Sequence, residues 1–91
     1  MILRIEIRSE GTETFMMQVD SACRIMAAAL KAAELSGYDC ADLRVYGPFG
    51  ELCGNTPESI RIGHILQVPG DEIYIRSGFY EAVMYLKSVS Y

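Results

Sequence analysis

The sequence has few of the residues that metal centres and disulfide frameworks require. It contains one histidine and three cysteines, Cys23, Cys40 and Cys53, and no two of these cysteines form a Cys-x-x-Cys pair. A tetrahedral zinc site or an iron–sulfur cluster needs several organised ligands, so we expect no metal and no other cofactor. An odd, widely spaced set of cysteines is typical of free thiols in a reducing compartment, which predicts a cytoplasmic location.

Long apolar runs are also missing. The first residues alternate and carry charge from Arg4 onward, which excludes a signal-peptide core, and no stretch has the length of a membrane-spanning helix. We therefore expect no direct membrane insertion. The 12 acidic and 8 basic side chains give a net charge of −4. This charge repels phosphate backbones on average, so we expect no nucleic acid partner.

A converging set of catalytic residues is not recognisable either. His64 lies between Gly63 and an isoleucine, and no sequence feature identifies a carboxylate to orient it or a nucleophile for it to activate. Cys23, beside Arg24 near the start of a predicted helix, is the one thiol placed for reactivity, although a half-buried packing cysteine is the favoured interpretation. We therefore predict that the protein is not an enzyme.

Alternating and helical patterns do cover most of the chain. Period-two alternation predicts strands over residues 2–8, 12–19, 43–46, 51–53 and 72–77. Between the second and third of these strands, residues 21–37 carry apolar side chains at helical spacing: Ala22, Ile25, Met26, Ala29, Leu30 and Ala33. Asp20 or Ser21 can cap the start of this helix, and Gly37 suits its left-handed end. A further helical turn is predicted at residues 56–59, before an apolar crossover.

The apolar stripe of the helix needs a partner, and a sheet laid across one helix is the simplest one. The 91 residues suffice for one core, so we expect an α+β domain over residues 1–78. Its mixed sheet of four to five strands packs on one main helix, with the strand at 72–77 parallel to the strand at 2–8 and beside it. Residues 79–91 form an apolar C-terminal extension. We favour a short helix there, packed on its own sheet or on a second copy in a homodimer.

The solvent-facing side of this sheet is the best candidate for a binding site. The alternation places six side chains there: Arg4, Arg8, Arg44, Tyr46, Tyr74 and Arg76. Arginine and tyrosine are enriched in the energetically important parts of protein interfaces. We therefore predict that this face binds a protein with an acidic or mixed-charge surface, the alternative being an ordinary solvated sheet face.

The element order over about residues 2–76 resembles that of the ubiquitin-like, or β-grasp, superfamily. The segment that ends in Gly70-Asp71-Glu72-Ile73-Tyr74-Ile75 looks like the last crossover and strand of these domains. Within the superfamily the pattern is most similar to the YukD-type proteins of bacterial type VII secretion. The resemblance implies a non-enzymatic accessory of a bacterial secretion system. The chain has no terminal Gly-Gly, so the alternative, a covalent modifier, requires processing after Gly78.

Overall fold

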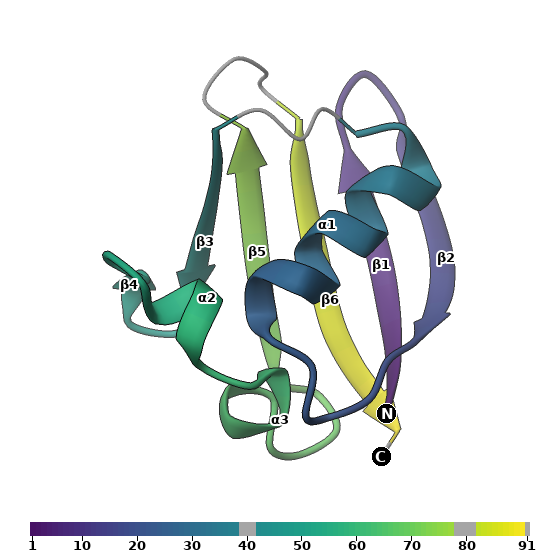
Figure 1. Ribbon diagram of the computed structural model, residues 1–91. Coiled ribbons are helices and arrows are strands. Elements are labelled where there is room, and N and C mark those ends of the chain that lie inside the picture. The colour runs from purple at the N-terminus through teal and green to yellow at the C-terminus, as the bar shows by residue number, and fades with distance from the viewer. Residues whose placement is uncertain (39–41, 78–81, 91) are drawn as a thin grey trace.

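A computed structural model of the chain describes residues 1–38, 42–77 and 82–90. Within these ranges the elements are β1 (Ile2–Arg8), β2 (Thr12–Gln18), α1 (Ile25–Ser36), β3 (Leu43–Gly47), β4 (Gly50–Glu51), α2 (Thr56–Ser59), α3 (Ile62–Ile65), β5 (Glu72–Ser77) and β6 (Val83–Ser90). The described strands form one sheet in the order β2-β1-β6-β5-β3-β4, and each neighbouring pair is antiparallel. Helix α1 crosses one face of this sheet, so the protein is α+β as predicted (Figure 1).

Strand β6 is the main departure from the predicted topology. It lies between β1 and β5 and pairs antiparallel with both, so the predicted parallel contact between the first strand and residues 72–77 is wrong. The described sheet has six strands and is antiparallel, so the predicted mixed sheet of four to five strands is also wrong. The short helix favoured for the C-terminal extension is also wrong over the described part of that extension. Met84, Leu86 and Ser88 are buried and alternate with outward side chains, so the period of two prevails there. The predicted boundary at Gly78 lies outside the described residues.

The strands that flank β6 were predicted well. Strand β1 and strand β5 have the bounds that their alternation indicated, and β2 ends one residue earlier than expected. In β1 and β5 the apolar side chains that point toward α1 are isoleucines and one leucine, whereas in β2 they are Phe15 and Met17. The helical turn predicted at residues 56–59 is confirmed as α2.

Helix α1 begins four residues later than predicted, because the preceding backbone pairs with a distant segment. The Ile62 N–H donates to the Cys23 carbonyl at 2.7 Å, and the Ile25 N–H donates to the Ile60 carbonyl at 3.1 Å. The Asp20 carboxylate accepts from the Ala22 N–H at 2.8 Å and so closes a turn rather than capping the helix. The predicted end is confirmed, since Gly37 adopts a φ of 75°.

The core lies between α1 and the inner face of the sheet, the face that α1 crosses. The buried stripe of the helix contains one isoleucine and four alanines: Ile25, Ala28, Ala29, Ala32 and Ala33. Leu30, which was predicted to lie in this stripe, is instead 43% exposed. Small side chains let the helix approach the sheet closely. The crossover adds Ile62 and Leu66, both fully buried, to the same core.

One glycine is required by a close backbone approach. A Cβ atom on Gly63 would lie 2.9 Å from the carbonyl oxygen of Ser21, a distance shorter than real Cβ contacts allow. The Gly63 N–H donates to that same carbonyl at 2.9 Å. Gly63 therefore allows the segment before α1 to lie directly against the segment before β5.

Candidate functional site

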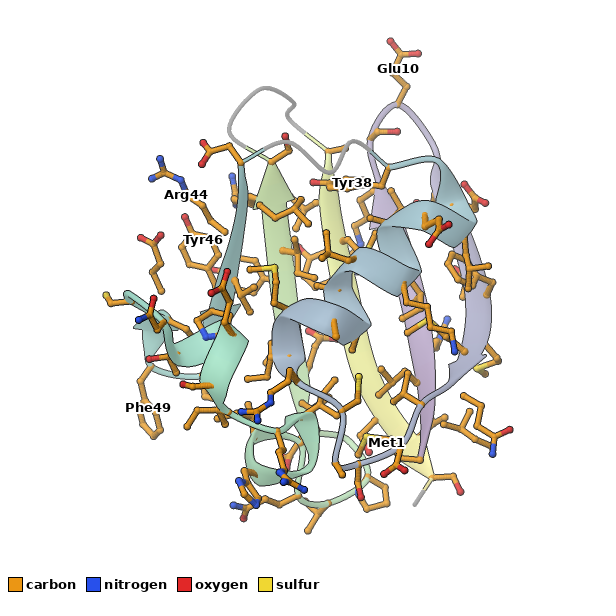
Figure 2. The ribbon with its side chains drawn as sticks, viewed as in Figure 1. Met1, Glu10, Tyr38, Arg44, Tyr46 and Phe49 are labelled. Atoms are coloured by element: carbon orange, nitrogen blue, oxygen red, sulfur yellow. The ribbon has the colours of Figure 1, made fainter. Side chains whose placement is uncertain are left out.

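The outer face of the sheet, opposite α1, carries all six of the predicted binding residues. Their side chains are exposed or half-buried, whereas their neighbours along each strand lie on the inward side and are buried or half-buried. Strands β3 and β5 bring four of the six together, because Arg44 lies opposite Arg76 and Tyr46 lies opposite Tyr74. Arg4 and Arg8 lie on β1, and β6 separates them from the other four. Figure 2 shows Arg44 and Tyr46 close together along β3.

Three tyrosines form a row across the middle of the outer face, which we call the tyrosine row: Tyr46, Tyr74 and Tyr85. The rings of Tyr46 and Tyr74 are stacked, with centroids 4.8 Å apart and an interplanar angle of 4°. The centroids of Tyr74 and Tyr85 are 5.9 Å apart. The Arg8 guanidinium lies 4.7 Å from the centroid of Tyr85 and closes that end of the row. The row is thus held by ring contacts, while no described residue forms a hydrogen bond with its hydroxyls.

Three arginines form a parallel line beside the tyrosines, which we call the arginine row: Arg8, Arg76 and Arg44. Arg44 on β3 lies directly opposite Arg76 on β5. Val83 on β6 lies between Arg76 and Arg8 and is opposite both of them. Like charges directly across an antiparallel pair repel each other. Arg44 has Asp42 at 3.6 Å and Arg8 has Glu6 at 2.7 Å, but no described carboxylate pairs with Arg76. The row is therefore only partly neutralised within the described part of the chain.

Strand β6 contributes two outer-face residues that the sequence interpretation missed. Tyr85 completes the tyrosine row, and Lys87 lies opposite both Arg4 and Glu72. These side chains line a shallow hollow of about 140 Å³ beside the tyrosine row. The alternation from Val83 to Ser88 was the available signal, but it was masked by the apolar character of the whole segment.

Charge on the molecule is divided unevenly between its surfaces. Five of the eight basic residues of the chain lie on the outer face: Arg4, Arg8, Arg44, Arg76 and Lys87. Three acidic residues on the strands, Glu6, Glu51 and Glu72, share this face, and Asp42 lies beside Arg44. A chain with a net charge of −4 thus presents one net positive surface.

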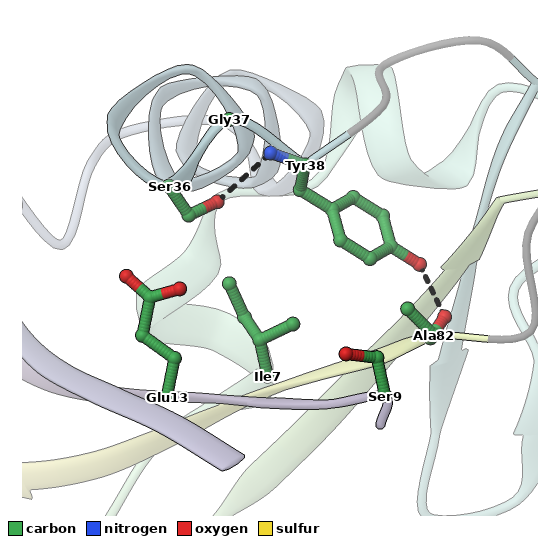
Figure 3. A pocket seen from close by; sticks show the side chains of 7 residues that line it. All are labelled: Ile7, Ser9, Glu13, Ser36, Gly37, Tyr38 and Ala82. Atoms are coloured by element: carbon green, nitrogen blue, oxygen red, sulfur yellow. Dashed lines mark hydrogen bonds between the residues drawn. The ribbon is translucent and has the colours of Figure 1, made fainter. Parts of the chain in front are cut away.

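A second candidate is a cavity of about 480 Å³ between the end of α1 and the β1–β2 end of the sheet (Figure 3). Tyr38 lines it, but the N–H and the hydroxyl of this residue form hydrogen bonds within the protein. Its N–H donates to Ser36 Oγ at 3.2 Å, and its hydroxyl donates to the Ala82 carbonyl at 2.5 Å. The hydroxyl also accepts from the Ser77 N–H at 3.1 Å. Glu13 is the one carboxylate in the described lining, so the cavity lacks a paired acid and base.

The remaining candidates are not brought together into a reactive site. His64 is exposed and lines a small hollow with Ser21, but no hydrogen bond joins them, and the described lining of this hollow contains no carboxylate. Cys23 precedes α1 rather than lying in its first turn, and its thiol donates to the Arg24 carbonyl. Cys53 is exposed, and Cys40 lies outside the described residues. Over the described ranges, no group of three or more histidine, cysteine or acidic residues could hold a metal ion.

Comparisons with models of protein families, with curated proteins and with solved structures find no match to this chain. Among the described residues, no helix combines the length and the apolar character that crossing a membrane would need. The outer face is therefore interpreted from its own geometry and charge.

Proposed function

We propose that this chain is a non-enzymatic protein-interaction domain whose outer face binds an acidic segment of a partner protein. The arginine row on an otherwise acidic chain is the observation that carries this proposal. A carboxylate placed between Arg44 and Arg76 would relieve the repulsion of two like charges that face each other. The tyrosine row beside it supplies broad, rigid contact area at small entropic cost, and its hydroxyls have no partner among the described residues.

The geometry of the tyrosines favours a protein over a nucleic acid. Proteins that bind single strands offer open aromatic faces on which bases stack. Here the stacked rings of Tyr46 and Tyr74 cover each other, and Arg8 lies over Tyr85. The overall charge of −4 also opposes a phosphate backbone. A short acidic peptide needs neither an open ring face nor a positive net charge.

Two further parts of the proposal, the fold family and the biological setting, are supported by the sequence resemblance and the order of the elements. We propose that the fold is a variant of the β-grasp in which β6 has entered between β1 and β5. Both flanking strands are antiparallel to β6 and so run in the same direction, as the β-grasp arrangement requires of them. The resemblance implies that the partner belongs to a bacterial secretion system, with the chain as a cytoplasmic accessory of it.

The covalent-modifier alternative is the weaker proposal. Processing after Gly78 would remove β6, and with it the pairing partner of both β1 and β5. The inward side chains of Met84 and Leu86 would leave the core at the same time. Intact-mass measurement of the protein from its native cells distinguishes the two: a full-length chain supports the interaction domain, and a species ending at Gly78 supports the modifier.

The binding proposal is tested by removing two members of the arginine row. The probe is a fluorescent glutamate-rich peptide, and a glutamine-rich peptide of equal length serves as the uncharged comparison. We expect Arg44→Ala with Arg76→Ala to weaken glutamate-peptide binding by about tenfold or more, measured by fluorescence anisotropy. The melting temperature should stay within a few degrees of wild type, because both side chains are exposed.

A second double variant controls for net charge. Lys31→Ala with Arg61→Ala also removes two positive charges, but from positions outside the outer face, and we expect this variant to retain binding. Binding to the wild-type protein should also weaken as salt is added, because exposed charges are screened. Equal peptide affinities for the two double variants would refute the role of the arginine row.

A further inference from the structure

The two edges of the sheet differ in how they are protected against pairing with another strand. Strand β4 forms one edge with only two residues, next to Pro48 in the turn that precedes it. Strand β2 forms the other edge with seven residues, and it pairs with β1 in an unbroken register without a bulge. It contains no proline or glycine, and Glu13 is its one charged residue. Short length, proline, bulges and charge are the usual protections of an edge, and β2 has almost none of them.

The hydrogen bonds at both ends of the β1–β2 hairpin show which backbone groups of β2 are free. Met1 and Val19 exchange two hydrogen bonds, at 2.8 and 3.0 Å, and the Ser9 N–H donates to the Gly11 carbonyl at 2.9 Å. Because bonded and non-bonded pairs alternate in an antiparallel ladder, the odd-numbered residues of β2 face β1. The even-numbered residues therefore direct their N–H and C=O groups away from the sheet: Thr12, Thr14, Met16 and Gln18. Among these groups, the Gln18 carbonyl already accepts from the Lys31 ammonium.

Exposed apolar side chains flank this open edge on both faces of the sheet. Met16 is 61% exposed on the outer face. On the other side, the Lys31 ammonium donates to the Gln18 carbonyl at 3.2 Å, which shows that this side of α1 faces β2. Leu35 follows Lys31 by one helical turn and so shares that side, and it is 62% exposed. In Figure 1 the C-terminal end of α1 overlies β2.

We propose that β2 pairs antiparallel with β2 of a second copy of this chain, with Phe15 at the twofold axis. This register aligns all seven residues of both strands and uses the outward groups of Thr14 and Met16 in reciprocal hydrogen bonds. The half-buried ring of Phe15 meets its own copy at the closely spaced, non-bonded position, where aromatic pairs are favourable. Glu13 faces Met17 of the second copy rather than another carboxylate. The strand is therefore complementary to itself in backbone, shape and charge.

This pairing has a consequence for the surface of the dimer. A twofold axis between antiparallel edge strands stands perpendicular to the sheet, so both outer faces lie on the same side. The dimer would have one continuous sheet, with the two arginine rows on one side and the two α1 helices on the other. The pairing does not depend on the proposed function, since it rests on the β2 edge alone.

Amide hydrogen exchange on the wild-type protein tests the proposal at the level of single residues. At low concentration the N–H groups of Thr12, Thr14, Met16 and Gln18 should exchange quickly, whereas those of the odd-numbered residues of β2 are protected by β1. At high concentration the even-numbered amides should become protected as light scattering reports twice the monomer mass. Free exchange of these amides at all concentrations, or dimer formation that leaves them unprotected, overturns the proposal.

A matched pair of variants tests the same contact without isotope exchange. Thr14→Pro removes an N–H that points away from β1, so the hairpin keeps its own ladder, and we expect the dimer to be lost. Thr14→Val keeps the N–H and the branched side chain, and we expect the dimer to remain. Leu35→Lys, which leaves β2 intact, should weaken the dimer by replacing an exposed apolar side chain beside the β2 edge with a charge in both copies. Equal dimer formation by the proline and valine variants overturns the proposal.

Discussion

Adjacent residues of β6 show how differently the two faces of the sheet are used. Leu86 points inward and is fully buried against the other strands and α1. Lys87, the next residue, points outward beside Arg4 and Glu72. The same strand thus contributes to the core through one set of side chains and to the candidate binding face through the other. Stability and binding should therefore respond to different residues, even where these are neighbours in the chain.

The largest expected change in stability comes from truncating an inward-facing side chain of β6. Leu86→Ala removes a fully buried side chain from a central strand, and we expect it to lower the free energy of unfolding by about 2–5 kcal/mol. Lys87→Ala should change it by less than about 0.5 kcal/mol, because this side chain is exposed. Denaturant unfolding of both variants provides the measurement. Similar losses for the two would contradict the division between faces.

A smaller loss of stability is expected from removing the Tyr38 hydroxyl, which forms hydrogen bonds with the backbone. Tyr38→Phe removes a hydroxyl that bonds the Ala82 carbonyl and the Ser77 N–H, so two hydrogen bonds to the backbone are lost. We expect a loss of about 1–3 kcal/mol. Tyr46→Phe on the outer face is the control, and its hydroxyl has no described partner to lose. Thermal unfolding that shifts equally for both would show that the Tyr38 hydroxyl does not stabilise the fold.

The smallest effect should have the opposite sign. The Ser88 hydroxyl is fully buried on the inner face and has no hydrogen-bond partner among the described residues. Ser88→Ala removes this unsatisfied group, and we expect the protein to gain about 1 kcal/mol in stability. Ser90→Ala, at an exposed position of the same strand, should be neutral. A lower melting temperature for the Ser88 variant would contradict the prediction and indicate a bound water at this hydroxyl.

Local pattern was sufficient for the elements whose structure depends on near neighbours. The alternation in β1 and β5 is regular, so the sequence alone predicted their bounds. The end of α1 was also predictable, because glycine readily adopts the left-handed conformation found at Gly37. The start of α1 depends instead on backbone pairing with the segment around Ile62. This segment is distant in the sequence, so a local pattern could not predict the contact. Strand β6 was missed because residues 79–87 are apolar under both the helical and the strand period.

The candidate site shows the same division. Six of its residues could be assigned to one face, since a period of two is enough for that. Their grouping into rows could not be predicted, because it depends on the register of β3, β5 and β6. Tyr85 and Lys87 were missed together with the strand that carries them. Leu30 was assigned to the buried stripe because it is a large apolar residue at helical spacing, whereas the observed stripe contains Ala28 and Ala32 instead.

The central position of β6 also has a consequence for folding kinetics. Among the described strands, the hairpin of β1 and β2 is connected to the group of β3, β4 and β5 only through β6. These two halves can form early from contacts that are closer in sequence, whereas the pairing of β1 with β6 joins opposite ends of the chain. Closing so long a loop is slow. On the ribosome, the halves must therefore wait for the last strand to emerge before one continuous sheet can assemble.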